Sequence, residues 1–266
     1  MQVPRHNRRT LLAAMMMAWI TTGAVEAADS AFSLHTKAVY NAVCSVCHGD
    51  DGTGKTVGDN RFPAVAGLQK WYIEDQLLKF KHDGRGADAR DKEGLMMHAL
   101  VRTLRTDEEI EKMASYIASQ LKDTAPALET VKGNVENGRK IYTAQGVMGC
   151  IRCHGDKFQG RDEEDADQLI PRAPSLTSQE DWYMLLQLEK FRSGVRGAPA
   201  RTLIGKNLEQ RRKDFARRQK REEKLNGAAL MQAMSQTAFA TQKDQEQAMK
   251  DVVAYIYSGS RKSKQP

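Results

Sequence analysis

Two short stretches of the chain place two cysteines and a histidine at the same spacing. They are Cys44, Cys47 and His48 in the first stretch, and Cys150, Cys153 and His154 in the second. Two thiols three residues apart lie on one helical turn, where they can add to the two vinyl groups of a haem while the histidine ligates its iron. The competing interpretation is a zinc site or a redox-active cysteine pair. Because a histidine follows the second cysteine in both copies, the pattern favours two covalently bound haem c groups.

A haem iron with one histidine ligand has a sixth position, and a methionine thioether there favours ferrous iron and raises its potential. The candidates are Met96, Met97 and His98 in the first part of the chain, and Met231 and Met234 in the second. A single methionine more often fills a core. Alignment of the two stretches pairs Met97 with Met231, whereas Met234 falls opposite a leucine and His98 opposite a glutamine. We therefore expect Met97 and Met231 as iron ligands, with Met96 and Met234 as alternatives.

The N-terminus has the pattern of a secretory signal. A basic start is followed by an apolar run from Leu11 to Ile20 and by small residues before Ala28. The run is shorter than the ~20 residues that a membrane span needs, so we expect cleavage after residue 27 and export to the periplasm, and not an uncut anchor. The pair Arg8 and Arg9 also resembles a twin-arginine signal. All four cysteines belong to the two motifs, so none is left for a disulfide.

Beyond the motifs, the two halves of the chain repeat one another. The residues from Pro63 to Gly86 recur 111 positions later, whereas those around Met97 recur 134 positions later. Duplication of one unit of roughly a hundred residues explains this. The jump in spacing locates an insertion in the second unit, at about residues 202–227. Pro126, within residues 124–128, predicts a linker between the units.

The apolar spacing predicts a helical protein. Helices are expected over residues 30–44, 70–81, 137–144, 179–192 and 244–257. Thr106 and the acidic residues after it predict a capped helix that continues through Ile117. No convincing alternating strand pattern is present.

The insertion holds nine basic and four acidic residues, a net charge of +5 in a chain whose total is +7. It lacks glycine and proline between Lys206 and Asn226, which predicts a helix. One interpretation is an exposed, solvated helix. The other is a docking element for an acidic redox partner or an anionic membrane surface. Nucleic acid is excluded as a partner because the protein is predicted to be exported.

These motifs resemble the di-haem cytochromes of the cytochrome c-four type, which consist of two class I cytochrome c domains. The resemblance rests on CSVCHG and CIRCHG, on the proline segments RFPAVAG and PRAPSLTS, on FKHDGRG and FRSGVRG, and on the methionine-bearing stretches before the last helix of each unit. It covers nearly the whole exported chain except the insertion.

The resemblance implies roles for further residues. In the family the methionine ligand stands seven residues before a leucine, as Met97 does before Leu104, whereas Met231 stands eight before Phe239. The family's proline accepts, through its carbonyl, the second ring N–H of the ligand histidine. Pro63 and Pro174 match that position. Arg85 and Arg196 could neutralise haem propionates, and the alternative for them is a solvated surface arginine.

The expected fold is therefore all-α, with two tandem class I cytochrome c domains that each surround one covalent haem. The expected boundaries are 1–27 for the signal peptide, 28–123 for the first domain, 124–128 for the linker and 129–266 for the second domain with its insertion. The expected function is electron transfer between respiratory partners, such as a quinol-oxidising complex and a membrane-bound terminal oxidase or reductase. The alternatives are an electron-entry subunit of a larger oxidoreductase and a di-haem enzyme such as a peroxidase.

Overall fold

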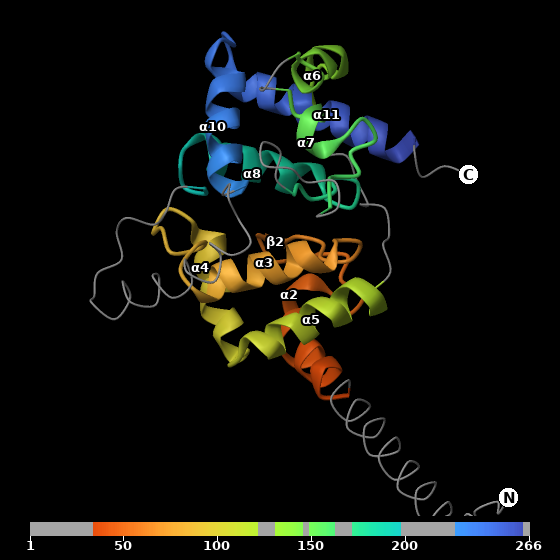
Figure 1. Cartoon of the computed structure of the whole chain (residues 1–266), viewed down its shortest axis with the longest axis vertical. Helices are drawn as coiled ribbons and strands as arrows, with labels where there is room; N and C mark the ends of the chain where they lie inside the picture. The colour runs from red at the N-terminus through yellow and green to blue at the C-terminus, as the bar shows by residue number, and fades with distance from the viewer. Residues whose placement is uncertain (1–33, 122–130, 146–148, 163–171, 198–226, 263–266) are drawn as a thin grey trace, which may run out of the picture.

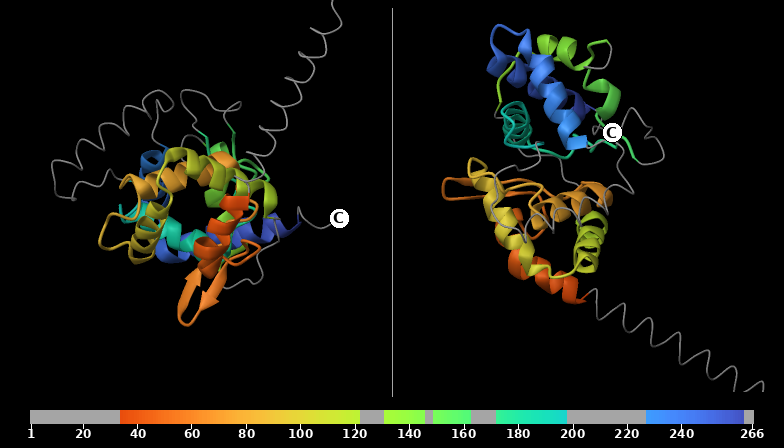
Figure 2. Two further views of the ribbon diagram at one scale, coloured as in Figure 1. Left: turned by 90° about the horizontal axis from the view of Figure 1, so that it is seen from below. Right: turned by 60° about the vertical axis from the view of Figure 1, so that its left-hand side comes forward.

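The computed structural model describes residues 34–121, 131–145, 149–162, 172–197 and 227–262. They form two helical bodies stacked along the long axis of the molecule (Figure 1), and a second direction shows the same stacking (Figure 2). The predicted signal peptide, the linker at 124–128 and almost all of the insertion at 202–227 lie outside the described residues. No helix within the described ranges is long and apolar enough to span a membrane.

The first half begins with helical residues 34–39, which run into a short π-helix. Its elements are η1 (Tyr40–Cys44), α2 (Ser45–His48), β1 (Lys55–Val57), β2 (Asn60–Phe62), α3 (Lys70–Lys81), α4 (Lys92–Leu100), η2 (Val101–Thr103) and α5 (Asp107–Gln120). The second half repeats the helices. Its elements are α6 (Val135–Tyr142), α7 (Ile151–His154), α8 (Asp181–Arg192), α10 (Gly227–Ala240) and α11 (Gln245–Lys262).

The structure confirms the predicted helical fold and most of the predicted helices. α3 has the predicted bounds, and α8 and α11 begin within two residues of theirs. α5 begins after Thr106, whose hydroxyl accepts from the Glu109 backbone N–H while the Glu109 carboxylate accepts from that of Thr106. The methionine-bearing stretches also form helices, α4 and α10, which the sequence pattern did not predict.

The mostly helical fold includes one short pair of strands, although the sequence has no convincing alternating strand pattern. β1 and β2 form an antiparallel hairpin in the register Lys55 to Phe62, which protrudes from the body (Figure 2, left). Each strand has only three residues and all but Phe62 are exposed, so no alternation of apolar and polar residues marks it. The hairpin is marked locally by its turn, where Gly58 adopts a positive φ of 58° that favours glycine.

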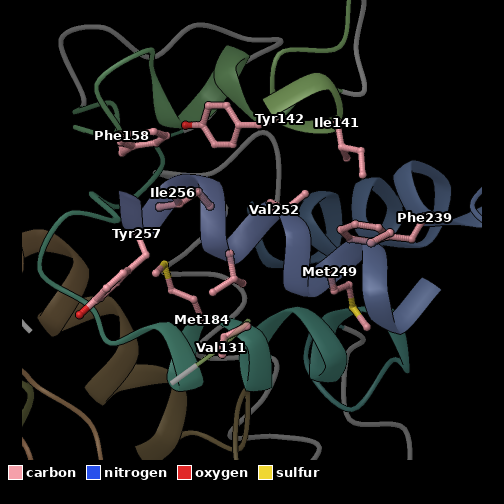
Figure 3. Packing of buried hydrophobic residues seen from close by; sticks show 12 residues of the cluster. Val131, Ile141, Tyr142, Phe158, Met184, Phe239, Met249, Val252, Ile256 and Tyr257 are labelled. Carbon is pink, nitrogen blue, oxygen red and sulfur yellow. The ribbon is translucent and has the colours of Figure 1, made fainter. Parts of the chain in front are cut away.

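Each half has its own apolar core. In the second half, α11 supplies Met249, Val252 and Ile256 to a cluster that also includes Tyr142 of α6 and Met184 of α8 (Figure 3). In the first half, the corresponding cluster gathers α5 residues such as Ile110 and Met113 with Tyr40 and Phe80. Two separate cores of this kind agree with duplication of one folding unit.

The halves meet through α3 and α8, which face each other across the middle of the molecule (Figure 1). The Trp71 indole N–H donates to Asp162 Oδ1 at 2.8 Å, and the guanidinium of Arg172 stacks 4.8 Å from the centre of the Trp71 ring. α3 and α8 are repeat counterparts, so the interface is formed by equivalent surfaces of the two units.

Candidate functional site

Each cysteine pair lies on a short helical turn that ends in the histidine. Cys44 and Cys150 are the N-cap residues of α2 and α7, and these helices carry the second cysteine and the histidine. All four thiols are free. Burial raises the pKa of the Cys44 and Cys150 thiols to about 11, and Cys44 packs against the apolar core of its half. The thiols of Cys44 and Cys150 are therefore protonated and lie beside the apolar cores of their halves.

The two histidines are buried and held in one orientation. His48 Nδ1 lies 2.7 Å from the Pro63 carbonyl oxygen, and His154 Nδ1 lies 2.9 Å from that of Pro174. A carbonyl only accepts, so Nδ1 carries the proton and Nε2 keeps its lone pair for a metal. Burial lowers the pKa of both histidines and outweighs the hydrogen bond to the proline, which raises it. Each imidazole is therefore neutral, as a metal ligand must be.

A glycine follows each histidine and turns the chain away from the motif. Gly49 and Gly155 have φ angles of 84° and 76°, in the region that favours glycine. Their carbonyls accept from the hydroxyls of two buried tyrosines, Tyr40 at 2.8 Å and Tyr142 at 2.7 Å. Burial raises the pKa of both tyrosines, which keeps the hydroxyls protonated as donors. Our sequence analysis missed this pair, although the two tyrosines stand 102 residues apart, near the 106 of the motifs.

The candidate methionines differ in their surroundings. Met97 packs against the core cluster of the first half, whereas the side chain of Met96 is 43% exposed. His98 Nε2 lies 2.5 Å from the buried carboxylate of Asp83, so this nitrogen already has a partner. In the second half Met234 is buried and Met231 is partly buried. The packing supports Met97 over Met96 in the first half.

Arg85 lies at the junction of the two halves. Its guanidinium donates to Gln76 Oε1 of its own half at 2.6 Å, and to the Tyr183 hydroxyl and Gln187 Oε1 of the other half at 2.8 and 3.0 Å. Its Nε is buried and lacks a hydrogen-bond partner. The side chain also stacks on Phe80, 4.5 Å from the ring centre. Arg85 is therefore not a solvated surface arginine.

Arg196 repeats this arrangement from the second half. It donates to Gln187 Oε1 at 2.6 Å, and across the junction to the Tyr72 hydroxyl and Gln76 Oε1 at 3.2 and 2.9 Å. It is buried and stacks on Phe191, 4.4 Å from the ring centre. The hydrogen-bond acceptors of both guanidinium groups are neutral oxygens, so two positive charges, that of the half-buried Arg85 and that of the buried Arg196, meet at the junction.

The donor set fits a covalent haem in each half. Two free thiols on one turn match the attachment points, and a neutral imidazole with its Nδ1–H engaged presents Nε2 for iron. The buried Nε–H of Arg85 has no hydrogen-bond partner and could donate to an anionic group of the haem.

Comparisons with known proteins agree with this geometry. The family model described as cytochrome c matches residues 35–120 and 135–260. The chain is 30% identical to cytochrome c4 of Pseudomonas aeruginosa over 203 residues, which cover 74% of this chain and 89% of that protein. It is 28% identical to cytochrome c4 of Azotobacter vinelandii over 199 residues, which cover 70% and 84%. The crystal structure of reduced recombinant cytochrome c4 from Pseudomonas stutzeri superposes with a TM-score of 0.52 at 23% identity, over 85% of this chain and 97% of that one.

Proposed function

Because the chain belongs to the cytochrome c family, as a di-haem electron carrier of the cytochrome c4 type with two covalent haems, we propose that it transfers electrons between respiratory redox partners in the periplasm. The observation that supports this most directly is the repeated histidine site. In both halves a buried, neutral imidazole is fixed by a proline carbonyl beside two free thiols. Such a site holds iron in one geometry, which suits a carrier whose ligands need not change between redox states.

Each residue of the site has a separate task in this proposal. A haem supplies one-electron redox chemistry between ferrous and ferric iron. Cys44 and Cys47 attach the first group and Cys150 and Cys153 the second, while His48 and His154 ligate the two irons. Met97 and Met231 provide the sixth ligands, with Met96 and Met234 as the alternatives. Pro63 and Pro174 fix the imidazole planes.

Arg85 and Arg196 are proposed to neutralise haem propionates at the junction of the halves. One guanidinium group is buried and the other half-buried, and both have only neutral hydrogen-bond acceptors, which favours an anionic group such as a propionate beside them. The guanidinium groups lower the pKa of Tyr72 although burial raises it.

The secretory pattern of residues 1–27 supports periplasmic export, and the +5 charge of residues 202–227 supports docking to an acidic partner protein. A quinol-oxidising complex as donor and a membrane-bound oxidase or reductase as acceptor would fit such docking. A fixed electron-entry subunit of a larger oxidoreductase is the second candidate, because the same basic segment could form a permanent interface.

The test is spectroscopic and kinetic. The oxidised holoprotein should show the weak near-infrared band of methionine–iron ligation with an intensity that corresponds to two haems. Stopped-flow mixing with bacterial membranes should then show reduction by quinol-driven donors and oxidation by a terminal oxidase, each at rates that rise with membrane concentration. A band of zero intensity would contradict the ligand assignment. If electrons pass to and from the membranes only when the protein is bound in a stable complex, the result would favour the electron-entry subunit of a larger oxidoreductase.

A further inference from the structure

The peptide bond that fixes each ligand histidine is itself held from the opposite half of the molecule. The Pro63–Ala64 peptide presents its carbonyl to His48 Nδ1 at 2.7 Å, and its N–H donates to both carboxylate oxygens of Glu180 at 3.1 Å. Glu180 belongs to the second half, at the N-cap of α8. One peptide group therefore connects a carboxylate of one half to the imidazole of the other.

The second histidine has the same connection in the reverse direction. The Pro174–Ser175 peptide presents its carbonyl to His154 Nδ1 at 2.9 Å, and its N–H donates to Gln69 Oε1 at 3.0 Å. Gln69 is the N-cap residue of α3 and stands 111 residues before Glu180, the repeat spacing of this region. The backbone at the two N-caps is nearly identical, with φ and ψ of −65° and 140° at Gln69 and −70° and 146° at Glu180.

The two relays differ in charge. Glu180 places a carboxylate at the end of the His48 relay, and Gln69 places a neutral amide at the end of the His154 relay. Burial raises the pKa of Glu180, so the difference in charge is largest at alkaline pH. Hydrogen bonds in a chain polarise one another, and a carboxylate makes a stronger acceptor than an amide. The carboxylate therefore draws the His48 Nδ1 proton more strongly toward Pro63, which makes Nε2 a better electron donor to iron.

Close packing keeps Glu180 in this position. A Cβ added to Gly54 would lie 2.6 Å from Glu180 Oε1, and the Gly54 N–H donates to the His48 carbonyl at 2.9 Å. Gln179 of the same half donates its Nε2 to the Ala64 carbonyl at 2.9 Å. Two consecutive residues of the other half, Gln179 and Glu180, thus hydrogen-bond to the backbone of the loop beside His48.

We propose that Glu180 and Gln69 are crossed potential-setting residues, and that the charge of Glu180 gives the first haem a lower reduction potential than the same relay would give with glutamine. This rests on the proposed function, since it takes His48 and His154 as iron ligands. Better electron donation from the histidine and a nearby negative charge both stabilise ferric iron. The repeat thereby produces two inequivalent haems from one ligand set by exchanging a single side-chain group.

The experiment is a charge swap in the holoprotein, measured by spectroelectrochemical titration at about pH 8, well above the ordinary carboxyl pKa range. Glu180→Gln should raise the reduction equilibrium constant of the first haem about tenfold, which is ~59 mV for a one-electron couple. The second haem should move much less. Gln69→Glu should shift the second haem by a similar factor in the opposite direction. The wave of the first haem is identified separately, as the one displaced by Met97→Ala.

The matched control is Asp162→Asn. Asp162 also accepts a hydrogen bond across the junction, from Trp71 at 2.8 Å, but it does not contact a proline peptide. We expect this variant to leave the reduction equilibrium constants of both haems within a factor of two of their wild-type values. Glu180→Ala removes the hydrogen-bond acceptor altogether. Like Glu180→Gln, it should raise the reduction potential of the first haem.

Three outcomes would overturn the relay. They are an unchanged first potential in Glu180→Gln, equal shifts of both haems, or a shift in Asp162→Asn as large as that in Glu180→Gln. Failure of the proposed function is distinguishable, because wild-type protein would then lack two reversible one-electron transitions before any variant is compared.

Discussion

At the scale of single residues, the site depends on a few atoms whose roles follow from their partners. Pro63 and Pro174 contribute a carbonyl and not a side chain, so their effect is to fix which nitrogen of the histidine bears the proton. Met97 is packed inward while Met96, its neighbour, is exposed. His98 is engaged by Asp83, a residue with a positive φ of 63°. These contacts lead to two predictions about the iron ligands.

Met97→Ala is expected to remove the near-infrared methionine–iron band of one haem and leave the other. Loss of a soft thioether destabilises ferrous iron, so the potential of that haem should fall by roughly 0.1 V, a fraction of the ~0.8 V that axial ligands span. Absorption spectroscopy and redox titration measure both effects. Met96→Ala serves as the control, and a larger effect in that variant would reverse the assignment.

The second haem is expected to respond to Met231→Ala in the same way, with loss of its band and a lower potential. Met234→Ala should instead behave as a core truncation and reduce unfolding free energy by ~2–5 kcal/mol, because its side chain is only 8% exposed. The comparison is made by spectroscopy and by urea unfolding of the two variants. If Met234→Ala removes the band and Met231→Ala does not, the repeat alignment is shifted by about one helical turn.

At the scale of elements, the crossing of α6 and α11 closes the second half. Gly138 of α6 approaches α11 so closely that an added Cβ would clash with the Asp251 backbone carbonyl. Asp251 also accepts from the Asn134 N–H and the Asn137 amide, both at 2.7 Å. These hydrogen bonds hold the start of α6 against one turn of α11. The apolar core of the second half packs around this crossing (Figure 3).

Gly138→Ala is expected to separate the two helices and to lower the unfolding free energy by ~1–3 kcal/mol, the usual cost of overpacking. Urea denaturation of the holoprotein measures this loss. Gly84→Ala is the matched control, because Gly84 is exposed and its added Cβ would have only ordinary contacts of 3.4 Å or more. Equal stability of the two variants would show that the crossing tolerates a wider separation.

At the scale of the whole molecule, the halves are joined by polar contacts that the duplication has partly preserved and partly changed. Lys190 of α8 contacts Asp91 and Glu93 of the first half at 2.6 and 2.7 Å. Its repeat counterpart Lys79 instead pairs with Asp75 on its own helix, at 2.7 Å. The position in α8 that corresponds to Asp75 is Leu186, so Lys190 has no acid one turn away and reaches across.

Lys190→Met is expected to destabilise the junction by about 3 kcal/mol, because Asp91 is only 2% exposed and would be left as a buried, unpaired charge. Thermal or urea unfolding of the holoprotein measures this. Lys79→Met is the control and should cost less, since it breaks a pair within one helix. A smaller loss for Lys190→Met than for Lys79→Met would mean that the cross-half pair does not stabilise the junction.

Deletion of residues 202–227 is expected to leave both haem spectra nearly unchanged, because the segment contains no cysteine, histidine or methionine. If the segment docks an acidic partner, electron transfer to that partner should slow several-fold at low ionic strength. The difference should shrink as salt screens the charges. Stopped-flow rates over a salt series test this, and equal rates at low salt would leave only the interpretation of a solvated segment.

The sequence alone determined the features that depend on local spacing. Attachment of haem needs two thiols and a histidine within five residues, and both copies of this motif can be read directly from the sequence. α3 and the capping box at Thr106 are also local, because they follow from apolar periodicity and from side chains three residues apart. The family resemblance implied that the carbonyls of Pro63 and Pro174 accept from the histidines, and in the structure these carbonyls lie 2.7 and 2.9 Å from Nδ1 of His48 and His154.

Only the tertiary structure decided which side chains of one half act on the other. Glu180 and Ala64 are 116 residues apart, and nothing in the local pattern of either distinguishes a contact from a solvated side chain. The same holds for Arg85, which the sequence left as either a partner of a haem propionate or a solvated surface arginine. Such contacts depend on how two folded units dock, and docking is set by the shape and charge of whole surfaces that no short stretch of sequence specifies.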